Sequence, residues 1–256
     1  MLYGGLDIGS VATKALLLEG GRMVSRALRP SGWDPRRAGE EALAAALAEI
    51  GRTATDLAAL TVTGYGRTLW QGPGEALTEI TCLVQGMRRL LPGVRTVFDL
   101  GGQDSKLLAL DRRGALDDFV INDRCAAGTG RFLEMAGQRL GLTVAELGEL
   151  GATAKESVRL SSVCAVFAES EVVGLLARGA ERDAVARGLC EAVAHQVLSL
   201  AGRLPREVPL ALVGGVAYNR GVRLALEHAL AERVIVPDEP QMVVALGAAL
   251  LAAEHS

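Results

Sequence analysis

The stretch LDIGSVATKALLL, from Leu6 to Leu18, returns in related form as FDLGGQDSKLLAL, from Phe98 to Leu110. In each copy an apolar segment ends in an acid and a glycine, a polar turn follows, and a second apolar segment begins after a lysine. This pattern predicts two β-hairpins. The two copies match at a constant offset of 92 residues, which aligns Asp7, Gly9 and Lys14 with Asp99, Gly101 and Lys106. A single repeat at this distance indicates duplication of a domain-sized unit, because a solenoid needs several stacked units.

The segments around the hairpins have a mixed α/β pattern. Asp34 and Pro35 are suited to be the N-cap and first residue of a helix that runs to about Ile50. We expect further strands at 58–63, 116–121, 210–213 and 234–236, and further helices at 75–91, 128–150 (two helices), 163–178, 181–203, 218–231 and 241–254. The predicted organisation is a first lobe at about 1–95, to which the C-terminal helix can return, and a second lobe at 96–256, with a cleft between them.

The amino-acid composition excludes some classes of partner and location for this protein. Half of the 256 residues are apolar but only 4% are aromatic, so the core must consist of Ala, Val and Leu, which favours helices packed on sheets. The net charge is −3 and no basic block stands out, which argues against nucleic acid and anionic membrane surfaces as partners. The longest apolar run, at 243–253, is too short to span a bilayer, and the first residues lack a secretory signal pattern. We therefore expect a cytoplasmic protein.

Both hairpins are candidate phosphate sites. Glycine turns let backbone N–H groups approach phosphate oxygens, and a nearby carboxylate can hold hydrated Mg²⁺. An ordinary tight turn with surface lysines is the better explanation of either hairpin alone, but the occurrence of the pair favours phosphate sites, and two of the three lysines in the chain occupy the same place in both copies. Neither a P-loop nor a GxGxxG motif occurs. The predicted catalytic residues are Asp7, Asp99, Gln103 and Asp104, and the predicted nucleotide-binding residues of the hairpins are Gly9, Ser10, Thr13, Lys14, Gly101, Gly102, Ser105 and Lys106.

A third glycine cluster stands in VGGVAYN, from Val213 to Asn219, between an expected strand and an expected helix. Gly214, Gly215 and Asn219 are candidates for contacting adenine or ribose at a helix N-terminus, although a plain strand-to-helix turn explains the segment equally well. Two phosphate hairpins followed by such a glycine pair resemble the actin, Hsp70 and sugar kinase superfamily of ATPases. The resemblance implies an α/β fold of two duplicated, ribonuclease H-like lobes with the nucleotide in the cleft.

The four cysteines divide into two pairs. Without a secretory signal they are not expected to form disulfides. Cys125, in NDRCAAGTGRFLE, and Cys164, in SSVCAVFAESE, stand near expected helix starts, where a thiol ionises readily and can bind metal. Cys82 and Cys190 stand within expected helices among apolar residues and are interpreted as core thiols. Cys125 and Cys164 could instead be small thiols that fill gaps between helices. If they lie at the two-fold axis of a symmetric dimer, one [4Fe-4S] cluster would be held by two ligands from each subunit.

The cysteine segments and the two hairpins together resemble the ATP-dependent activators of 2-hydroxyacyl-CoA dehydratases, a family that includes the ATPase subunits of benzoyl-CoA reductases. The resemblance covers essentially the whole chain. It implies an oxygen-sensitive homodimer of anaerobic metabolism that binds ATP or ADP with Mg²⁺ and carries one bridging [4Fe-4S] cluster. Such a protein receives an electron from ferredoxin or flavodoxin and passes it to a dehydratase or related CoA-ester reductase as ATP is hydrolysed.

Two other functions remain open at this stage. A small-molecule kinase of the same superfamily would need a carboxylate base, for which Asp104 or Glu169 could serve. A non-catalytic or filament-forming nucleotide-binding module would need none. Neither alternative explains the paired cysteine motifs, and iron content distinguishes both from an activator.

Overall fold

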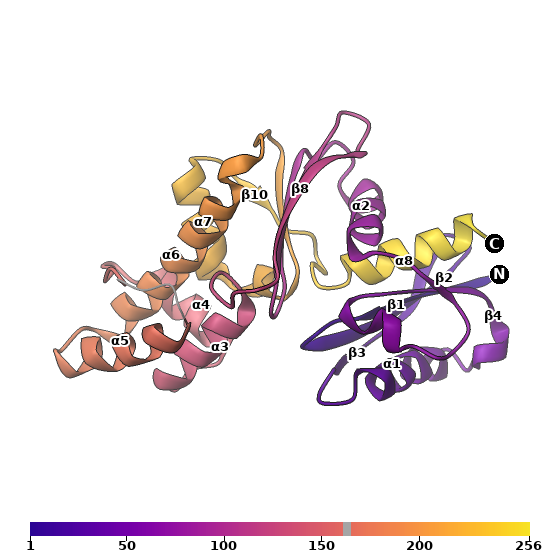
Figure 1. Cartoon of the computed structure of the whole chain (residues 1–256), viewed down its shortest axis with the longest axis horizontal. Coiled ribbons are helices and arrows are strands. Elements are labelled where there is room, and N and C mark those ends of the chain that lie inside the picture. The colour runs from indigo at the N-terminus through magenta and orange to yellow at the C-terminus, as the bar shows by residue number, and fades with distance from the viewer. Residues whose placement is uncertain (161–164) are drawn as a thin grey trace. The chain divides into compact units, whose positions relative to one another are not determined.

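A computed structural model of the chain has two compact units, Met1–Pro92 with Gln241–Ser256, and Gly93–Pro240 (Figure 1). It describes residues 1–160 and 165–256. The division falls slightly before the expected boundary at residue 95, and the last sixteen residues belong with the first unit. Each unit contains one five-stranded sheet.

The sheet of the first unit has the strand order β3-β2-β1-β4-β5. Its first three strands form an antiparallel meander, to which β4 and then β5 are added in parallel. The strands are β1 (Leu2–Ile8), β2 (Ala12–Glu19), β3 (Arg22–Pro30), β4 (Leu57–Thr63) and β5 (Glu75–Ala76). The hairpin and β4 agree with the sequence prediction, whereas β3 and β5 are not among the expected elements.

Three helices complete this unit, and they lie on both faces of the sheet. α1 (Pro35–Glu49) packs on the face that carries Leu6 and Val62, and α8 (Val243–Glu254) packs on the opposite face (Figure 1). Asp34 caps α1 as predicted, since its carboxylate accepts a bond from Arg37 N at 3.1 Å. α2 (Glu79–Leu90) packs against α8. It begins at its Thr78 cap and not at residue 75, because β5 occupies residues 75–76.

The second sheet has the order β10-β9-β6-β7-β8, which is the first order again when it is read from β8. Its strands are β6 (Thr96–Leu100), β7 (Ser105–Leu110), β8 (Leu116–Asn122), β9 (Leu210–Val213) and β10 (Val234–Ile235). The register repeats as well: Asp7 pairs with Lys14 in the first sheet, and Asp99 pairs with Lys106 in the second. The predicted duplication is therefore confirmed.

The helices of the second unit stand mostly between its third and fourth strands. They are α3 (Gly130–Arg139), α4 (Val144–Thr153), α5 (Ala165–Ala177), α6 (Arg182–Leu200) and, after β9, α7 (Arg220–Leu230). Their apolar faces join the sheet in a core that contains Phe98 and Phe132 among many Ala, Val and Leu side chains. Short 3₁₀ helices occupy 54–56, 65–69, 201–203 and 215–218.

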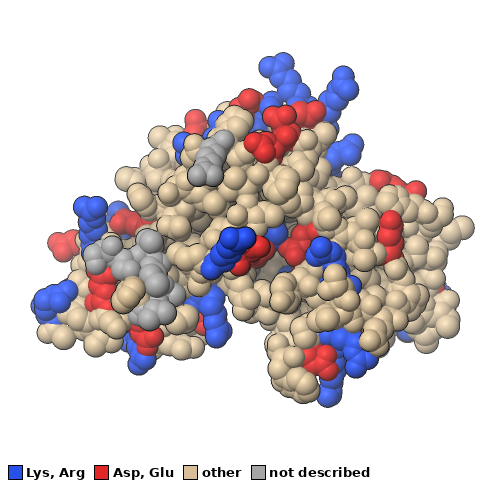
Figure 2. Space-filling model, viewed as in Figure 1, with Lys and Arg blue, Asp and Glu red and all other residues tan. Residues whose placement is uncertain are grey.

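The surface carries charges of both signs. On the face drawn in Figure 2, Lys and Arg side chains are interspersed with Asp and Glu side chains. Within the described ranges, no helix is long and apolar enough to cross a membrane.

Candidate functional site

The first predicted phosphate hairpin joins β1 to β2. Asp7 is only 5% exposed, and Lys14 Nζ donates a hydrogen bond to Asp7 Oδ2 at 2.9 Å. Gly9 begins the turn, where a Cβ would lie 2.7 Å from the carbonyl oxygen of Ala12 and 3.2 Å from Lys14 Nζ. Only glycine therefore allows the turn to close beside this buried ion pair.

The second hairpin repeats this geometry between β6 and β7. Asp99 is also 5% exposed, and Lys106 Nζ lies 3.6 Å from Asp99 Oδ2. Lys106 also donates a hydrogen bond to Asp104 in the turn. A Cβ on Gly101 would overlap the Asp104 carboxylate and would force that side chain to move from its present position. Each hairpin thus brings together an acid, a glycine turn and a lysine, as the repeat predicts.

The two hairpin hydroxyls are engaged within the protein. Ser31 Oγ donates to the carbonyl oxygen of Gly9 at 2.6 Å, so Thr13 is the donor in its own 2.9 Å bond with Ser31. Ser105 Oγ donates to the carbonyl oxygen of Gly128 at 2.8 Å. Thr13 and Ser105 are both buried. Donation from either hydroxyl to a phosphate would require its present bond to break.

At the end of the neighbouring parallel strand, each aspartate lies against a glycine whose φ is in the left-handed region. Gly214 follows β9 with a φ of 84°, and a Cβ there would lie 2.6 Å from Asp99 Oδ1. Gly64 follows β4 with a φ of 90°, and a Cβ there would lie 2.6 Å from Asp7 Oδ1. Gly64 was not among the predicted site residues. The signal for it is the apolar strand that ends in TGYG at Thr63–Gly66, which parallels the strand that ends in VGG.

Asn219 shapes the third glycine segment from inside the protein. Its side chain is 1% exposed, accepts from Val222 N at 2.9 Å and donates to the carbonyl oxygen of Val144 at 2.8 Å. These bonds cap α7 and join it to α4. In this arrangement Asn219 supports the turn at Gly214 and Gly215, and contact with a nucleotide would have to come from the glycine backbone.

The remaining predicted residues lie at the same turns. Ser10, Gly102 and Gly215 are half-buried, and Gln103 is exposed at the tip of the second hairpin. The structure therefore places Asp7, Gly9, Ser10, Thr13 and Lys14 together in the first unit. It places the second hairpin beside the Gly214 segment in the second unit.

Cys125 lies in a loop between β8 and α3, with an exposed free thiol. Asn122 Nδ2 donates to the carbonyl oxygens of Cys125 and Ala127, at 2.9 and 3.3 Å. Thr129 Oγ1 donates to the carbonyl oxygen of Ala126 at 2.6 Å. Cys164 lies outside the described residues.

The other two cysteines are packed in the core. Burial raises the pKa of Cys82 from 9.0 to about 12, and burial also raises the pKa of Cys190 to about 12. Both thiols therefore stay protonated at neutral pH and are poor metal ligands. No group of three or more His, Cys, Asp or Glu side chains within residues 1–160 and 165–256 could hold a metal ion.

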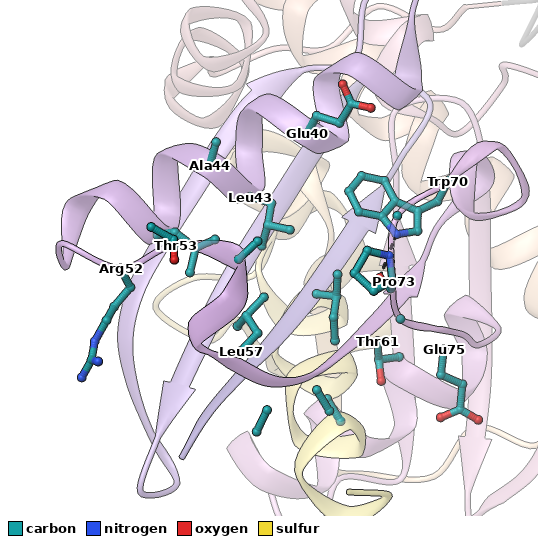
Figure 3. A pocket seen from close by; sticks show the side chains of 18 of the residues that line it. Glu40, Leu43, Ala44, Arg52, Thr53, Leu57, Thr61, Trp70, Pro73 and Glu75 are labelled. Carbon is teal, nitrogen blue, oxygen red and sulfur yellow. Dashed lines mark hydrogen bonds between the residues drawn. The ribbon is translucent and has the colours of Figure 1, made fainter.

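The first unit also contains a cavity of about 730 Å³ between α1, β4 and the segment at 70–75 (Figure 3). Leu43, Leu57 and Trp70 line it, and the Trp70 indole N–H donates to the carbonyl oxygen of Pro73 at 3.1 Å. A 3₁₀ helix joins β4 to β5 on this side, whereas the second unit has α7 between β9 and β10. None of the predicted nucleotide-binding residues lines this cavity.

The carboxylates proposed for a kinase base are both in ion pairs. Asp104 is paired with Lys106, and Glu169 is paired with Arg139. A general base must reach the reacting hydroxyl, so each carboxylate would first have to leave its present ion pair. The geometry at the hairpins suits a nucleotide phosphate with a metal ion, which needs positioned charges and backbone donors.

Two sheets of identical strand order, each with an Asp–Lys pair at its first hairpin, give the duplicated α/β fold of the actin, Hsp70 and sugar kinase class. The chain belongs to the BadF/BadG/BcrA/BcrD ATPase family, whose sequence profile matches residues 5–252.

Relatives of known name support this assignment. The chain is 37% identical over 252 residues to the 2-hydroxyisocaproyl-CoA dehydratase activator of Clostridioides difficile, covering 98% of this chain and 95% of that protein. It is 38% identical over 254 residues to the (R)-2-hydroxyglutaryl-CoA dehydratase activating ATPase of Acidaminococcus fermentans, covering 97% and 95%. The solved structure of the Clostridium difficile activator with bound ADPNP superimposes with a TM-score of 0.95 at 38% identity, over 100% of this chain and 95% of that chain.

Proposed function

We propose that this protein is an ATP-hydrolysing activator that passes one low-potential electron to a 2-hydroxyacyl-CoA dehydratase or a related CoA-ester reductase. The observation that carries the proposal is the combination of two Asp–Lys hairpins with an exposed cysteine loop in one chain. The names of its relatives, which are dehydratase activators, support the same partner class.

In this proposal the nucleotide is ATP or ADP with Mg²⁺, and each hairpin, together with the Gly214 segment beside the second one, offers groups that suit a nucleotide phosphate. Asp7 and Asp99 would hold the hydrated metal ion, and Lys14 and Lys106 would neutralise phosphate charge. The ADPNP in the related activator structure supports a nucleotide of this kind. Gln103, which is exposed at the hairpin tip, would orient the attacking water.

The iron–sulfur group is one [4Fe-4S] cluster shared by two copies of the chain, with Cys125 and Cys164 of each as ligands. The donor set fits to this extent: Cys125 is an exposed thiol, whereas Cys82 and Cys190 are buried and protonated. When bound, the cluster supplies one-electron redox chemistry. The chain's own contribution is the loop that presents Cys125, held by Asn122. The electron donor in this proposal is ferredoxin or flavodoxin.

Iron content tests the proposal. Anaerobically reconstituted protein should bind about two iron atoms per chain, because one four-iron cluster is shared by two chains. Cys125→Ser and Cys164→Ser should each lose the iron, since one substitution removes two of four ligands in a symmetric dimer. Cys82→Ser and Cys190→Ser are matched controls that should retain it. A colourless wild-type protein, or iron loss that follows Cys82 or Cys190 instead, would contradict the proposal.

A further inference from the structure

The segment that follows Cys125 is hydrogen-bonded directly to the second phosphate hairpin. Ser105 Oγ donates to the carbonyl oxygen of Gly128 at 2.8 Å. Gly130 N donates to the carbonyl oxygen of Gly101 at 2.9 Å, and Arg131 N donates to that of Gly102 at 2.8 Å. Three bonds thus connect residues 128–131 to the hairpin turn.

The other side of the cysteine loop is held by the adjacent strand. Asn122, at the end of β8, is the register partner of Ser105 on β7. Its amide donates to the carbonyl oxygens of Cys125 and Ala127. Asn122 and Ser105, which are neighbours on β8 and β7, therefore bond the loop at residues 125, 127 and 128. Cys125 lies within this hydrogen-bonded loop.

The first unit provides an internal comparison. Thr13 occupies the place of Ser105 and also bonds the segment that follows the third strand, through Ser31. Ser31 N also donates to the carbonyl oxygen of Val11 in the first turn at 2.9 Å. In both units the hydroxyl at this position thus bonds the segment that follows the third strand, although the backbone bonds join different turn positions, and of these two segments the one in the second unit carries a cysteine.

We infer that Ser105 is a positioning residue for Cys125: its hydroxyl and the adjacent turn backbone tie residues 128–131 to the phosphate hairpin, so that a change in the hairpin displaces the cysteine loop. Ser105 is buried at 1% exposure, and its hydroxyl acts on the loop and not on solvent. The nucleotide-dependent part of this inference rests on the proposed function, in which the hairpin binds nucleotide phosphate.

Amide hydrogen exchange of the purified full chain, kept anaerobic, tests the inference. In the absence of nucleotide, Ser105→Ala should raise exchange of the amides at 128–131 about fivefold, the effect of one lost hydrogen bond. In the wild type, saturating MgADP should change the amide exchange rates at 128–131 relative to the nucleotide-free protein. In Ser105→Ala, the rates at 128–131 should be the same with and without MgADP. Ser105→Thr should restore the response to MgADP, because the hydroxyl is retained and Thr13 shows that threonine is accommodated in the matching register.

Ser25→Ala is the matched control, since it removes a buried hydroxyl-to-carbonyl bond, from Ser25 Oγ to Ala46, in the first unit and away from the hairpin turns, and it should leave the response at 128–131 intact. An unchanged response in Ser105→Ala, or an equal loss in Ser25→Ala, would overturn the inference. Calorimetry with MgADP on the same samples separates the two proposals. If the wild type binds no nucleotide, the proposed function fails. If it binds nucleotide and residues 128–131 do not respond, the inference fails alone.

Discussion

Asp7 and Asp99 are buried carboxylates, each beside a lysine and beneath a left-handed glycine. An unpaired charge is costly to bury, and in each hairpin the lysine offsets the charge of the acid. The glycine of the next parallel strand leaves room for the carboxylate, because a Cβ there would overlap it. This arrangement leaves the two acids aligned in the same register of two equivalent sheets. This shared geometry explains why Asp, Gly and Lys recur in the sequence at a constant offset of 92 residues.

The first residue-scale prediction concerns these acids. Asp7→Asn or Asp99→Asn should reduce ATP turnover by at least about 100-fold, because phosphoryl transfer depends on metal positioning and charge neutralisation. Steady-state ATPase assays measure this, with circular dichroism to verify folding. Asp117→Asn, at an exposed position of β8, is the control and should have normal turnover. Near-normal turnover in either buried variant would contradict the assignment.

The second residue-scale prediction concerns the buried thiols. Because burial raises the pKa of Cys82 and Cys190 to about 12, neither should react with iodoacetamide at pH 8 in the native protein, whereas Cys125 should. In the unfolded chain these thiols lose their protons near pH 9, whereas in the folded chain they keep them up to about pH 12. The free energy of unfolding should therefore be constant, as far as these thiols determine it, below about pH 9 and should decrease as the pH rises toward 12. Mass spectrometry of labelled peptides checks the first point, and denaturant titrations at increasing pH check the second.

At the scale of elements, the sequence predicts the hairpins and α1 well, because the residues that specify them are adjacent in the chain. The duplication is also predicted, because the hairpin sequence recurs at an offset of 92 residues. β3 shows why other elements escape prediction. Its buried residues are the small Ser25 and Ala27, whereas Met23 and Leu28 are largely exposed, so the usual apolar alternation is reversed. α1 packs closely on the small residues, and Ser25 Oγ donates to the carbonyl oxygen of Ala46 at 2.7 Å. This packing is a tertiary effect that hydropathy does not encode.

The role of Gly64 escapes sequence analysis for a related reason. Its requirement for glycine comes from Asp7 on a strand far away in the chain, which only the β1–β4 pairing brings close. The engaged hydroxyls of Thr13 and Ser105 are likewise invisible in the sequence, where a hydroxyl in a glycine turn indicates only a free donor. The sequence therefore predicts that the hairpin residues lie together, but it does not show which of their hydroxyls already bond within the protein.

An element-scale prediction concerns α8. A Cβ on Gly247 would overlap the carbonyl oxygen of Cys82 on α2, so Gly247→Ala must push the two helices apart. It should destabilise the protein by about 3 kcal/mol, the upper end of the range for an overpacked core. Gly174→Ala in α5 is the control, because its Cβ would lie 3.4 Å from the flexible end of Arg178. That variant should be neutral or stabilising by about 1 kcal/mol. Urea titrations give both values, and equal stability of the two variants would refute this packing.

At the scale of the whole molecule, duplication gives two equivalent hairpin sites but only one cysteine loop. Helices α3 to α6 stand between β8 and β9, where the first unit has only α1 and a short 3₁₀ helix. The second unit thus adds the cysteine segments to a hairpin arrangement that both units share. We expect this asymmetry to link nucleotide state to electron delivery, and the linkage must be reciprocal for binding.

The central claim is that nucleotide state reaches the cluster. The most direct measurement is the rate at which a ferrous chelator removes iron from anaerobically reconstituted protein without nucleotide, with MgADP and with a non-hydrolysable ATP analogue. The account predicts that the rates differ among the three states and that Asp99→Asn, which lacks a proposed metal ligand, removes the difference. Identical chelation rates in all three states of the wild type, with nucleotide binding demonstrated in the same sample, would contradict it.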